Sequence, residues 1–167
     1  IMSTKNLFSD EAKQKIKDLA TDIDFAMFAS GLKEYPIHMV PMSTKKVDEE
    51  GLIWFLSNRN SQHNQNINLN SAMHLVYSDA SKMKFLNVFG QASITTNFEI
   101  IKELYESTDD AWFDGVNDPN ITAISVRPDQ AFYWDPKNNT LVTLLKMGMG
   151  AITGDEPDLM DQGELNI

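Results

Sequence analysis

The spacing of apolar residues changes from a helical period to an alternating one early in the chain. Apolar side chains recur at helical spacing within residues 9–23, which predicts an amphipathic helix. Ser9 is the expected N-cap of this helix, and the acidic residues Asp10 and Glu11 suit the positive end of its dipole. From Phe25 onward apolar and polar residues alternate, which indicates β-strands.

Alternating stretches recur along most of the remaining chain and are separated by short polar turns. The predicted strands are 25–30, 35–44, 52–57, 73–78, 84–96, 121–127, 131–135 and 140–147. Further helices are expected to start near Asn60 or Ser61 and at Asn97. Strands joined by short links, without a βαβ alternation, favour a mainly β fold with a few helices, arranged as a small antiparallel β-barrel.

The domain organisation that follows is a single domain over residues 1–167. It comprises the N-terminal helix at 9–23, a barrel with inserted helices at 24–147, and a glycine- and aspartate-rich C-terminal tail at 148–167, expected to be partly mobile.

Single residues within the predicted strands add local detail. Pro41 lacks a backbone N–H, so its strand is expected at a sheet edge or beside a bulge. Gly90 indicates a bulge or a close approach of two backbones. Pro128 is expected to interrupt the strand that begins at Ile121.

The charge balance is acidic and narrows the classes of partner. The chain has 24 acidic and 14 basic residues, a net charge of −10, and only Arg59 and Arg127 as arginines. Binding to nucleic acid or to an anionic membrane surface needs a basic face, so the sequence predicts neither. Any anionic ligand would have to be held by few side chains or by backbone N–H groups.

Cysteine is absent, which excludes thiol nucleophiles, thiolate metal ligands and disulfides. This composition is typical of a reducing compartment, and the apolar runs are too short for a transmembrane helix. Without the apolar core of a signal peptide near the start, the sequence predicts a soluble, cytoplasmic protein.

Motifs for common chemistries are missing. His38, His63 and His74 have no metal-binding spacing, and no G-x-S-x-G, G-x-G-x-x-G or Walker A motif occurs. The stretch 57–63 leaves a strand and enters a helix, so Ser61, Arg59, His63 and backbone N–H groups could receive a phosphate. A plain capped turn explains the same residues.

Several short segments together resemble one family. They are His38-Met39-Val40-Pro41-Met42, Gly51-Leu52-Ile53-Trp54-Phe55, Ser57 through His63, Val88-Phe89-Gly90-Gln91-Ala92, Ala111-Trp112-Phe113, Val126-Arg127-Pro128 and Tyr133-Trp134-Asp135. Their order and spacing over nearly the whole chain resemble the FMN-binding split β-barrels related to pyridoxamine 5′-phosphate oxidase, in particular the bacterial general stress protein branch.

The resemblance implies a homodimer that binds FMN in a groove between two barrels. By this resemblance, His38, Met39, Val40, Pro41 and Ser43 line the cofactor, with the backbone near Met39 and Val40 facing the flavin ring. Leu56, Ser57, Ser61, Gln62 and His63 form the phosphate end, and Trp112 lies near the cleft. An aliphatic wall for a flat ring, with hydroxyl, amide and cationic donors for a phosphate, is chemically consistent.

The chain departs from the family at three positions. The branch usually has arginine where Val40 stands and lysine where His63 stands, and the oxidases proper have arginine where His38 stands. A lost charge-assisted hydrogen bond costs about 1.5–3 kcal/mol, so FMN binding is expected to be weakened or lost. No arginine follows Arg127 to read a substrate phosphate, which argues against pyridoxamine phosphate oxidation.

Two functions remain open from the sequence. The first is an FMN-binding flavoprotein with a stress-related oxidoreductase role, in which no residue is assigned as catalytic acid or base. The alternative is a non-enzymatic split-barrel dimer whose flavin site is weakened or lost and which binds another small ligand or a protein partner. A third possibility keeps the barrel with another large cofactor, such as a deazaflavin or haem, although no histidine stands out as an axial ligand for haem. The substrate and electron donor are not predicted.

Overall fold

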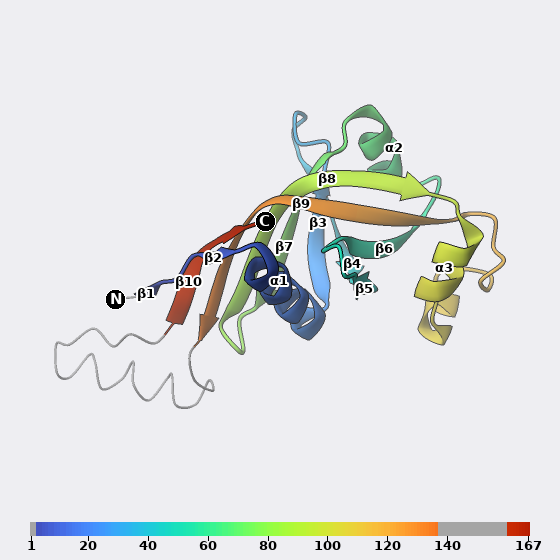
Figure 1. The fold of residues 1–167 in the computed structure, drawn as a ribbon. Helices are drawn as coiled ribbons and strands as arrows, with labels where there is room; N and C mark the ends of the chain where they lie inside the picture. Colours follow the sequence, from blue (N-terminus) through green and yellow to red (C-terminus); the bar gives the residue numbers. More distant parts are fainter. Residues whose placement is uncertain (1–2, 137–159) are drawn as a thin grey trace.

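The computed structural model describes residues 3–136 and 160–167, in which strands are the commonest regular structure (Figure 1). The elements are β1 (Ser3–Thr4), β2 (Leu7–Phe8), α1 (Ser9–Ile23), β3 (Phe25–Ser30), β4 (His38–Ser43), β5 (Lys46–Val47), β6 (Ile53–Asn58), α2 (Gln62–Leu69), β7 (Ala72–Asp79), β8 (Lys84–Thr95), α3 (Phe98–Leu104), the 3-10 helix η1 (Ser107–Ala111), β9 (Ile121–Pro136) and β10 (Met160–Asn166). None of the helices in these residues has the length and apolar character to span a membrane.

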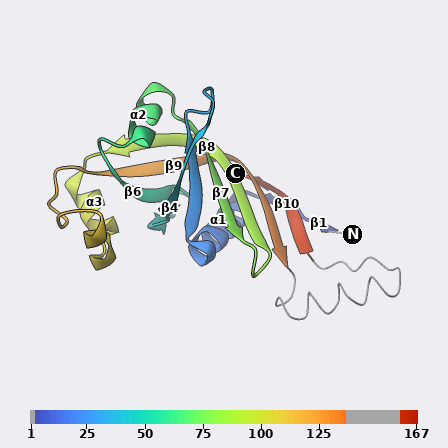
Figure 2. The same ribbon diagram turned by 180° about the vertical axis from the view of Figure 1, so that it is seen from behind.

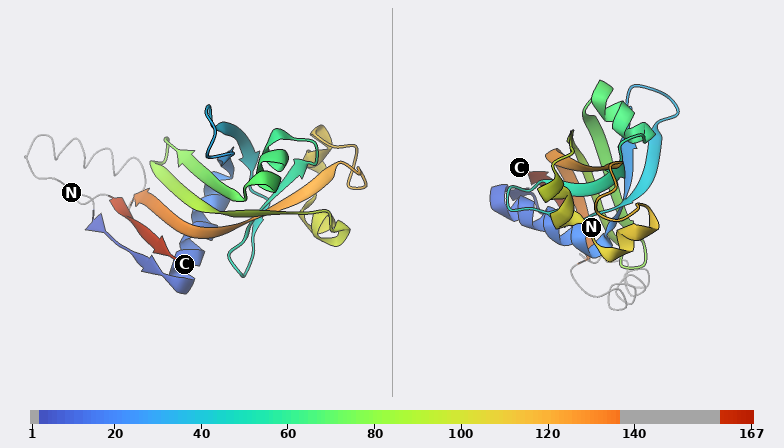
Figure 3. Two further views of the ribbon diagram at one scale, coloured as in Figure 1. Left: turned by 90° about the horizontal axis from the view of Figure 1, so that it is seen from above. Right: turned by 90° about the vertical axis from the view of Figure 1, so that its right-hand side faces the viewer.

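The strands form one mixed sheet that is not closed. Its main path runs β1-β10-β9-β8-β7-β3-β4, while β2 pairs with β10 and β6 pairs with both β9 and β5. Within the described residues no ladder joins β4 to β6, so the barrel is split between these strands (Figure 3). The predicted mainly β fold is confirmed, but the sheet is not wholly antiparallel, because β1 and β2 run parallel to β10.

Strand β9 connects the two parts of the sheet. Its first part pairs with β6 over Ile121–Val126, and its last part pairs with β10 over Ala131–Pro136. Strand β8 runs antiparallel along the other edge of β9. The position of β6, and with it one wall of the split, is therefore fixed by its register on β9.

A bulge lets β9 continue through Pro128. The β8–β9 register shifts between Phe89 and Gly90, so that Asp129 has no partner in β8. A Cβ atom at Gly90 would lie 2.2 Å from the Arg127 carbonyl oxygen, so only glycine fits there. The predicted bulge at Gly90 is confirmed. The predicted interruption at Pro128 is wrong, because the bulge accommodates the residue that cannot donate a backbone hydrogen bond.

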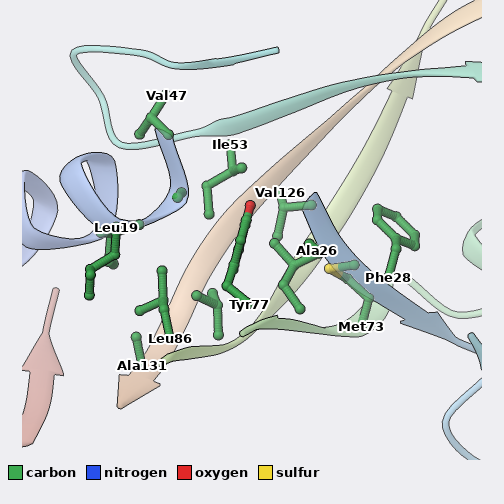
Figure 4. Close-up of a cluster of buried hydrophobic side chains, with 14 of the residues drawn as sticks. Leu19, Ala26, Phe28, Val47, Ile53, Met73, Tyr77, Leu86, Val126 and Ala131 are labelled. Carbon is green, nitrogen blue, oxygen red and sulfur yellow. The ribbon is translucent and has the colours of Figure 1, made fainter. Parts of the chain in front are cut away.

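Helix α1 covers part of the sheet and contributes to the main core. Its buried side chains are Ala12, Ile16, Leu19 and Ala20, as the helical spacing predicts. Figure 4 shows Leu19 in the same cluster as Tyr77 and Leu86 of β7 and β8. Farther along this core, Phe28 and Phe55 pack edge to face with ring centroids 5.4 Å apart.

The structure confirms two of the three N-cap residues predicted for the helices. Ser61 precedes α2 and its hydroxyl accepts the Asn64 N–H at 3.2 Å, and Asn97 accepts the N–H groups of Glu99 and Ile100 before α3. Both predicted starts are confirmed. Ser9 is not the N-cap of α1; Phe8 holds that place without a side-chain cap bond, because β2 leads directly into the helix.

The predicted C-terminal tail contains a strand. Residues 160–166 form β10, antiparallel to β9, with Met160 and Leu165 buried. The backbone of Gly163 passes so close to β1 and β2 that a Cβ atom there would lie 2.4 Å from the Lys5 carbonyl oxygen. The sequence did not predict this strand, because polar residues separate its two buried positions. The predicted strand 140–147 lies outside the described residues.

Candidate functional site

A cavity of about 440 Å³ occupies the split between β4 and β6. Figure 2 shows these strands between α2 and the end of the molecule that carries α3. The cavity is lined by Phe25, Pro41, Met42, Ser43, Lys45, Leu56, Ser57, Asn58, His63, Asp109, Trp112 and Phe113. Its wall is therefore largely apolar and aromatic, with polar groups placed at a few points, as in small-molecule sites generally.

The structure brings together many of the predicted site residues. Pro41, Ser43, Leu56, Ser57, His63 and Trp112 line this cavity. A second cavity of about 430 Å³ is lined by His38, Met39 and Gln62, beside the loop that follows β3. Val40 and Ser61 line neither cavity: Val40 packs against the main core, and Ser61 caps α2.

His38 and His63 lie face to face between the two cavities. Their ring centroids are 6.1 Å apart at an interplanar angle of 22°, and Phe28 packs 5.7 Å from the His63 ring. The Nε2 atoms of both histidines are buried without a hydrogen-bond partner. Burial and the neighbouring His38 lower the pKa of His63 to about 4, so this ring is neutral at pH 7.

The start of α2 is held against the sheet by a buried hydrogen-bond network. The Ser57 hydroxyl donates to Asn64 Oδ1 at 2.8 Å, and Asn64 Nδ2 donates to Thr122 Oγ1 at 2.8 Å. Ser57 and Thr122 hydroxyl oxygens lie 2.7 Å apart, and all three side chains are buried. The network joins β6, α2 and β9, and it uses the Ser57 hydroxyl that the sequence placed at the phosphate end.

Other polar residues predicted for the site have partners within the protein. The Ser43 hydroxyl donates to Asp24 at 2.7 Å, and Gln62 Nε2 donates to Asn66 at 3.0 Å. Arg59, which the sequence suggested as a phosphate ligand, is exposed and lines neither cavity.

An ion pair on the cavity wall was missed from the sequence. Lys45 Nζ lies 2.7 Å from Asp109 Oδ1 and 3.4 Å from Glu106 Oε2, and the Lys45 and Asp109 side chains are only 8% and 10% exposed. The sequence placed Lys45 in a polar connection and Asp109 in an acidic loop, and nothing in the spacing joins them. Among the residues that line the cavity, Lys45 is the one with a permanent positive charge, and a carboxylate already compensates it.

Two exposed aromatic side chains line the cavity. Trp112 is 80% exposed and Phe25 is 59% exposed. The backbone of η1 positions Trp112, because the Trp112 N–H donates to the Asp109 carbonyl at 2.9 Å and Asp109 Oδ2 accepts the Glu106 N–H at 2.8 Å. Exposed aromatic faces beside an apolar cavity can stack on a planar ligand.

No group of three metal-binding side chains is found in residues 3–136 and 160–167.

Comparison with known families gives the class of the protein. The sequence profile described as "Pyridoxamine 5'-phosphate oxidase like" matches residues 11–158. The chain therefore belongs to the pyridoxamine 5′-phosphate oxidase like family, which confirms the resemblance found in the sequence. No curated protein sequence matches the chain.

Solved structures of this fold are similar over most of the chain. A general stress protein 26 candidate from Jannaschia sp. CCS1 has a TM-score of 0.77 at 19% identity, covering 94% of this chain and 98% of that one. General stress protein 26 from Bacillus anthracis str. Sterne has a TM-score of 0.64 at 20% identity, covering 72% and 92%.

The name of a third similar structure mentions FMN. The pyridoxamine 5′-phosphate oxidase-related, FMN binding protein from Nostoc punctiforme PCC 73102 has a TM-score of 0.55 at 10% identity, covering 75% of this chain and 81% of that one. At these identities the three structures establish the fold, which is the split barrel of this family.

Proposed function

We propose that this protein binds FMN in the cavity between β4 and β6 and acts as a flavin-dependent oxidoreductase or flavin carrier. The observation that carries this proposal is the cavity itself. It gathers Pro41, Leu56, His63 and Trp112, residues predicted from the sequence, in a space of about 440 Å³. That volume is in the range of about 300–1,000 Å³ found for sites of small molecules and cofactors.

The residues present fit the ring of FMN better than its phosphate. Phe25, Leu56 and Trp112 offer apolar and aromatic surface to a flat isoalloxazine. Toward α2, His63 offers an unpartnered ring nitrogen, and the helix start contributes its positive dipole end. Lys45 adds little, because Asp109 holds it in an ion pair. We therefore expect FMN to bind through its ring, with a phosphate contribution smaller than a free lysine or arginine would give.

When bound, FMN would supply reversible electron transfer at its ring, and the protein would supply position and exclusion of water. Trp112 and Phe25 would cover one side of the ring, and Leu56 and Pro41 would form its apolar wall. Lys45 and Asp109 would place a compensated pair of charges at the edge of the cavity. None of these groups needs to act as an acid or base for electron transfer.

A homodimer is part of the proposal and is supported by an exposed apolar face. Phe25, Met27 and Met39 are 59%, 39% and 45% exposed, and Val76 is 37% exposed. Met27 pairs with both Pro41 and Val76 across β4, β3 and β7, so these side chains share one side of the sheet. Because Phe25 and Pro41 also line the cavity, a second copy on this face would cover part of the bound flavin.

We also propose that the protein is cytoplasmic. The sequence has no cysteine, which suits a reducing compartment.

The test is a fluorescence titration of FMN with the purified protein, in which binding quenches the flavin. We expect saturable quenching, and we expect Trp112→Ala to weaken it about two- to tenfold, since an aromatic pair contributes about 0.5–1.5 kcal/mol. Phe98→Ala is the matched control, because Phe98 is 44% exposed and lines neither cavity. An absence of quenching by the wild-type protein would reject FMN as the ligand.

The alternative function is a non-enzymatic dimer that binds another small ligand or a protein partner. The observation that favours it is the Lys45–Asp109 pair, which leaves the cavity without a free permanent cation for a phosphate. Riboflavin, which is the same ring without the phosphate, separates the two cases. Tighter binding of a non-flavin ligand than of both FMN and riboflavin would support the alternative.

A further inference from the structure

Two methionines are neighbours on the exposed sheet face that the proposed dimer buries. Met27 of β3 is 39% exposed, and Met39 of β4 is 45% exposed. Met27 pairs with Pro41, which is two residues beyond Met39 on β4, so the two methionines are diagonal neighbours on the same side of the sheet. Diagonal neighbours lie about 7–8 Å apart, which is within reach of long side chains.

These two methionines are also the ones most open to a dissolved oxidant. Within residues 3–136 and 160–167, Met42, Met73 and Met160 are at most 8% exposed, and Met83 is half-buried. The chain has nine methionines and no cysteine, so the thioether is the sulfur group that an oxidant can modify.

We propose that Met27 and Met39 form a peroxide-sensitive modification site whose oxidation separates the dimer. The inference rests on the homodimer of the proposed function and adds a means of controlling it. In the separated protomers, hydrogen peroxide reaches both thioethers. The sulfur lone pair attacks one peroxide oxygen, so that an S–O bond forms and the O–O bond breaks. The sulfur loses two electrons, the transferred oxygen gives up its proton, and the other oxygen leaves as water, giving methionine sulfoxide.

A sulfoxide is unfavourable on this face because its surroundings are apolar. Its oxygen is polar and can only accept hydrogen bonds. Met27 stands between Pro41 and Val76 in the ladder, and Met39 stands opposite Ala29. None of these three partners has a side-chain donor. A second copy seated on the face would bury the oxygen without a partner, so oxidised protomers associate more weakly.

The experiment treats the purified protein with hydrogen peroxide. Peptide mass spectrometry measures the oxidation of each methionine, and analytical ultracentrifugation measures the dissociation constant of the dimer. We expect Met27 and Met39 to be oxidised before the buried Met42 and Met73, and the dissociation constant to rise about tenfold or more. Their oxidation should slow as the protein concentration rises above the dissociation constant, because the dimer covers both sulfurs. Reduction by methionine sulfoxide reductases should restore the dimer.

Leucine substitutions show which methionines carry the response. The double variant Met27→Leu/Met39→Leu keeps a similar apolar volume, so we expect a dimer that peroxide no longer separates. Met83→Leu is the matched control, because it removes a half-buried methionine in the turn between β7 and β8 and should keep the wild-type response. A dimer that persists after Met27 and Met39 are oxidised, or a double variant that still separates in peroxide, overturns the inference.

Quenching of FMN by the untreated protein is measured in parallel, so that the two proposals fail separately. A dimer that binds FMN and is unaffected by peroxide overturns the inference and leaves the proposed function standing. A wild-type protein that is monomeric before treatment overturns the inference together with the proposed dimer, and an absence of FMN quenching rejects FMN binding alone.

Discussion

At positions 38 and 63 this chain has histidines, where the resemblance to the family implies arginine and lysine. His63 lines the cavity at the predicted phosphate end, yet its surroundings keep the ring neutral at pH 7. The acidic composition and the scarcity of arginine first argued against nucleic acid as a partner. The structure shows that free positive charge is also scarce in the cavity, since Asp109 pairs with Lys45, the lysine of the cavity wall.

A substitution that restores a permanent charge tests the placement of His63. We expect His63→Lys to tighten FMN binding about tenfold at pH 7.5, because a charge-assisted hydrogen bond contributes about 1.5–3 kcal/mol. Fluorescence titration measures the effect, with His74→Lys as the control for the same change on a histidine outside the cavities. An unchanged affinity of His63→Lys would contradict the position of His63 beside the phosphate.

The lowered pKa of His63 also predicts how stability depends on pH. A histidine whose pKa is lower in the folded state than in the unfolded one binds fewer protons when folded. Stability from this residue is therefore complete above about pH 6.5 and declines as the pH falls toward 4. Urea unfolding of the wild type and His63→Gln at several pH values gives the difference in their free energies of unfolding. This difference should be constant above about pH 6.5, and below that pH the wild type should lose stability relative to His63→Gln. Parallel curves would contradict the lowered pKa.

Among the secondary-structure elements, α2 contributes His63 to the cavity wall. The buried network of Ser57, Asn64 and Thr122 ties its first turn to β6 and β9, next to His63. The sequence predicted this helix and its Ser61 cap correctly, since both are local features. It could not predict the network, which depends on the register of β6 on β9, a contact between segments distant in the chain.

Removing one hydroxyl from the network tests its role. Thr122→Val keeps the shape of the side chain but leaves Asn64 Nδ2 and the Ser57 hydroxyl with fewer partners. We expect a loss of about 1–3 kcal/mol in the free energy of unfolding, measured with urea. Thr108→Val, at an exposed position of η1, should change stability by less than about 0.5 kcal/mol. Equal effects of the two variants would show that the network adds no stability.

Local sequence patterns were sufficient to predict some strands but not others. Alternation predicted β7 and β8 almost to the residue, and Gly90 marked its bulge, because both depend on neighbours in sequence. Strand β10 was missed because polar residues separate Met160 from Leu165, and its order comes from pairing with β9 and with the N-terminal strands. The same limit applies to the Lys45–Asp109 pair, which tertiary structure alone brings together.

The whole molecule is an open barrel whose split holds the cavity and whose outer sheet face is apolar. Both features point to association, because the exposed Phe25 and Met27 belong to β3, and Phe25 also lines the cavity. Apolar side chains grouped on one exposed sheet face are typical of a surface that another protein covers.

The dimer is predicted to depend on this face. We expect the purified protein to sediment as a dimer in analytical ultracentrifugation, and Met27→Asp to shift it toward monomer by placing a charge in the interface. Phe98→Asp is the control, because Phe98 is similarly exposed, at 44%, and lies on α3 rather than on this face of the sheet. A wild-type monomer, or a dimer unaffected by Met27→Asp, would contradict this interface.

The most direct test of FMN binding in the split of the barrel is a crystal structure of the protein grown with saturating FMN. We expect density for the isoalloxazine ring in the cavity between β4 and β6, against Trp112 or Phe25, with the phosphate within hydrogen-bonding distance of His63. Flavin density elsewhere on the molecule, or a cavity that holds no flavin under these conditions, would contradict it.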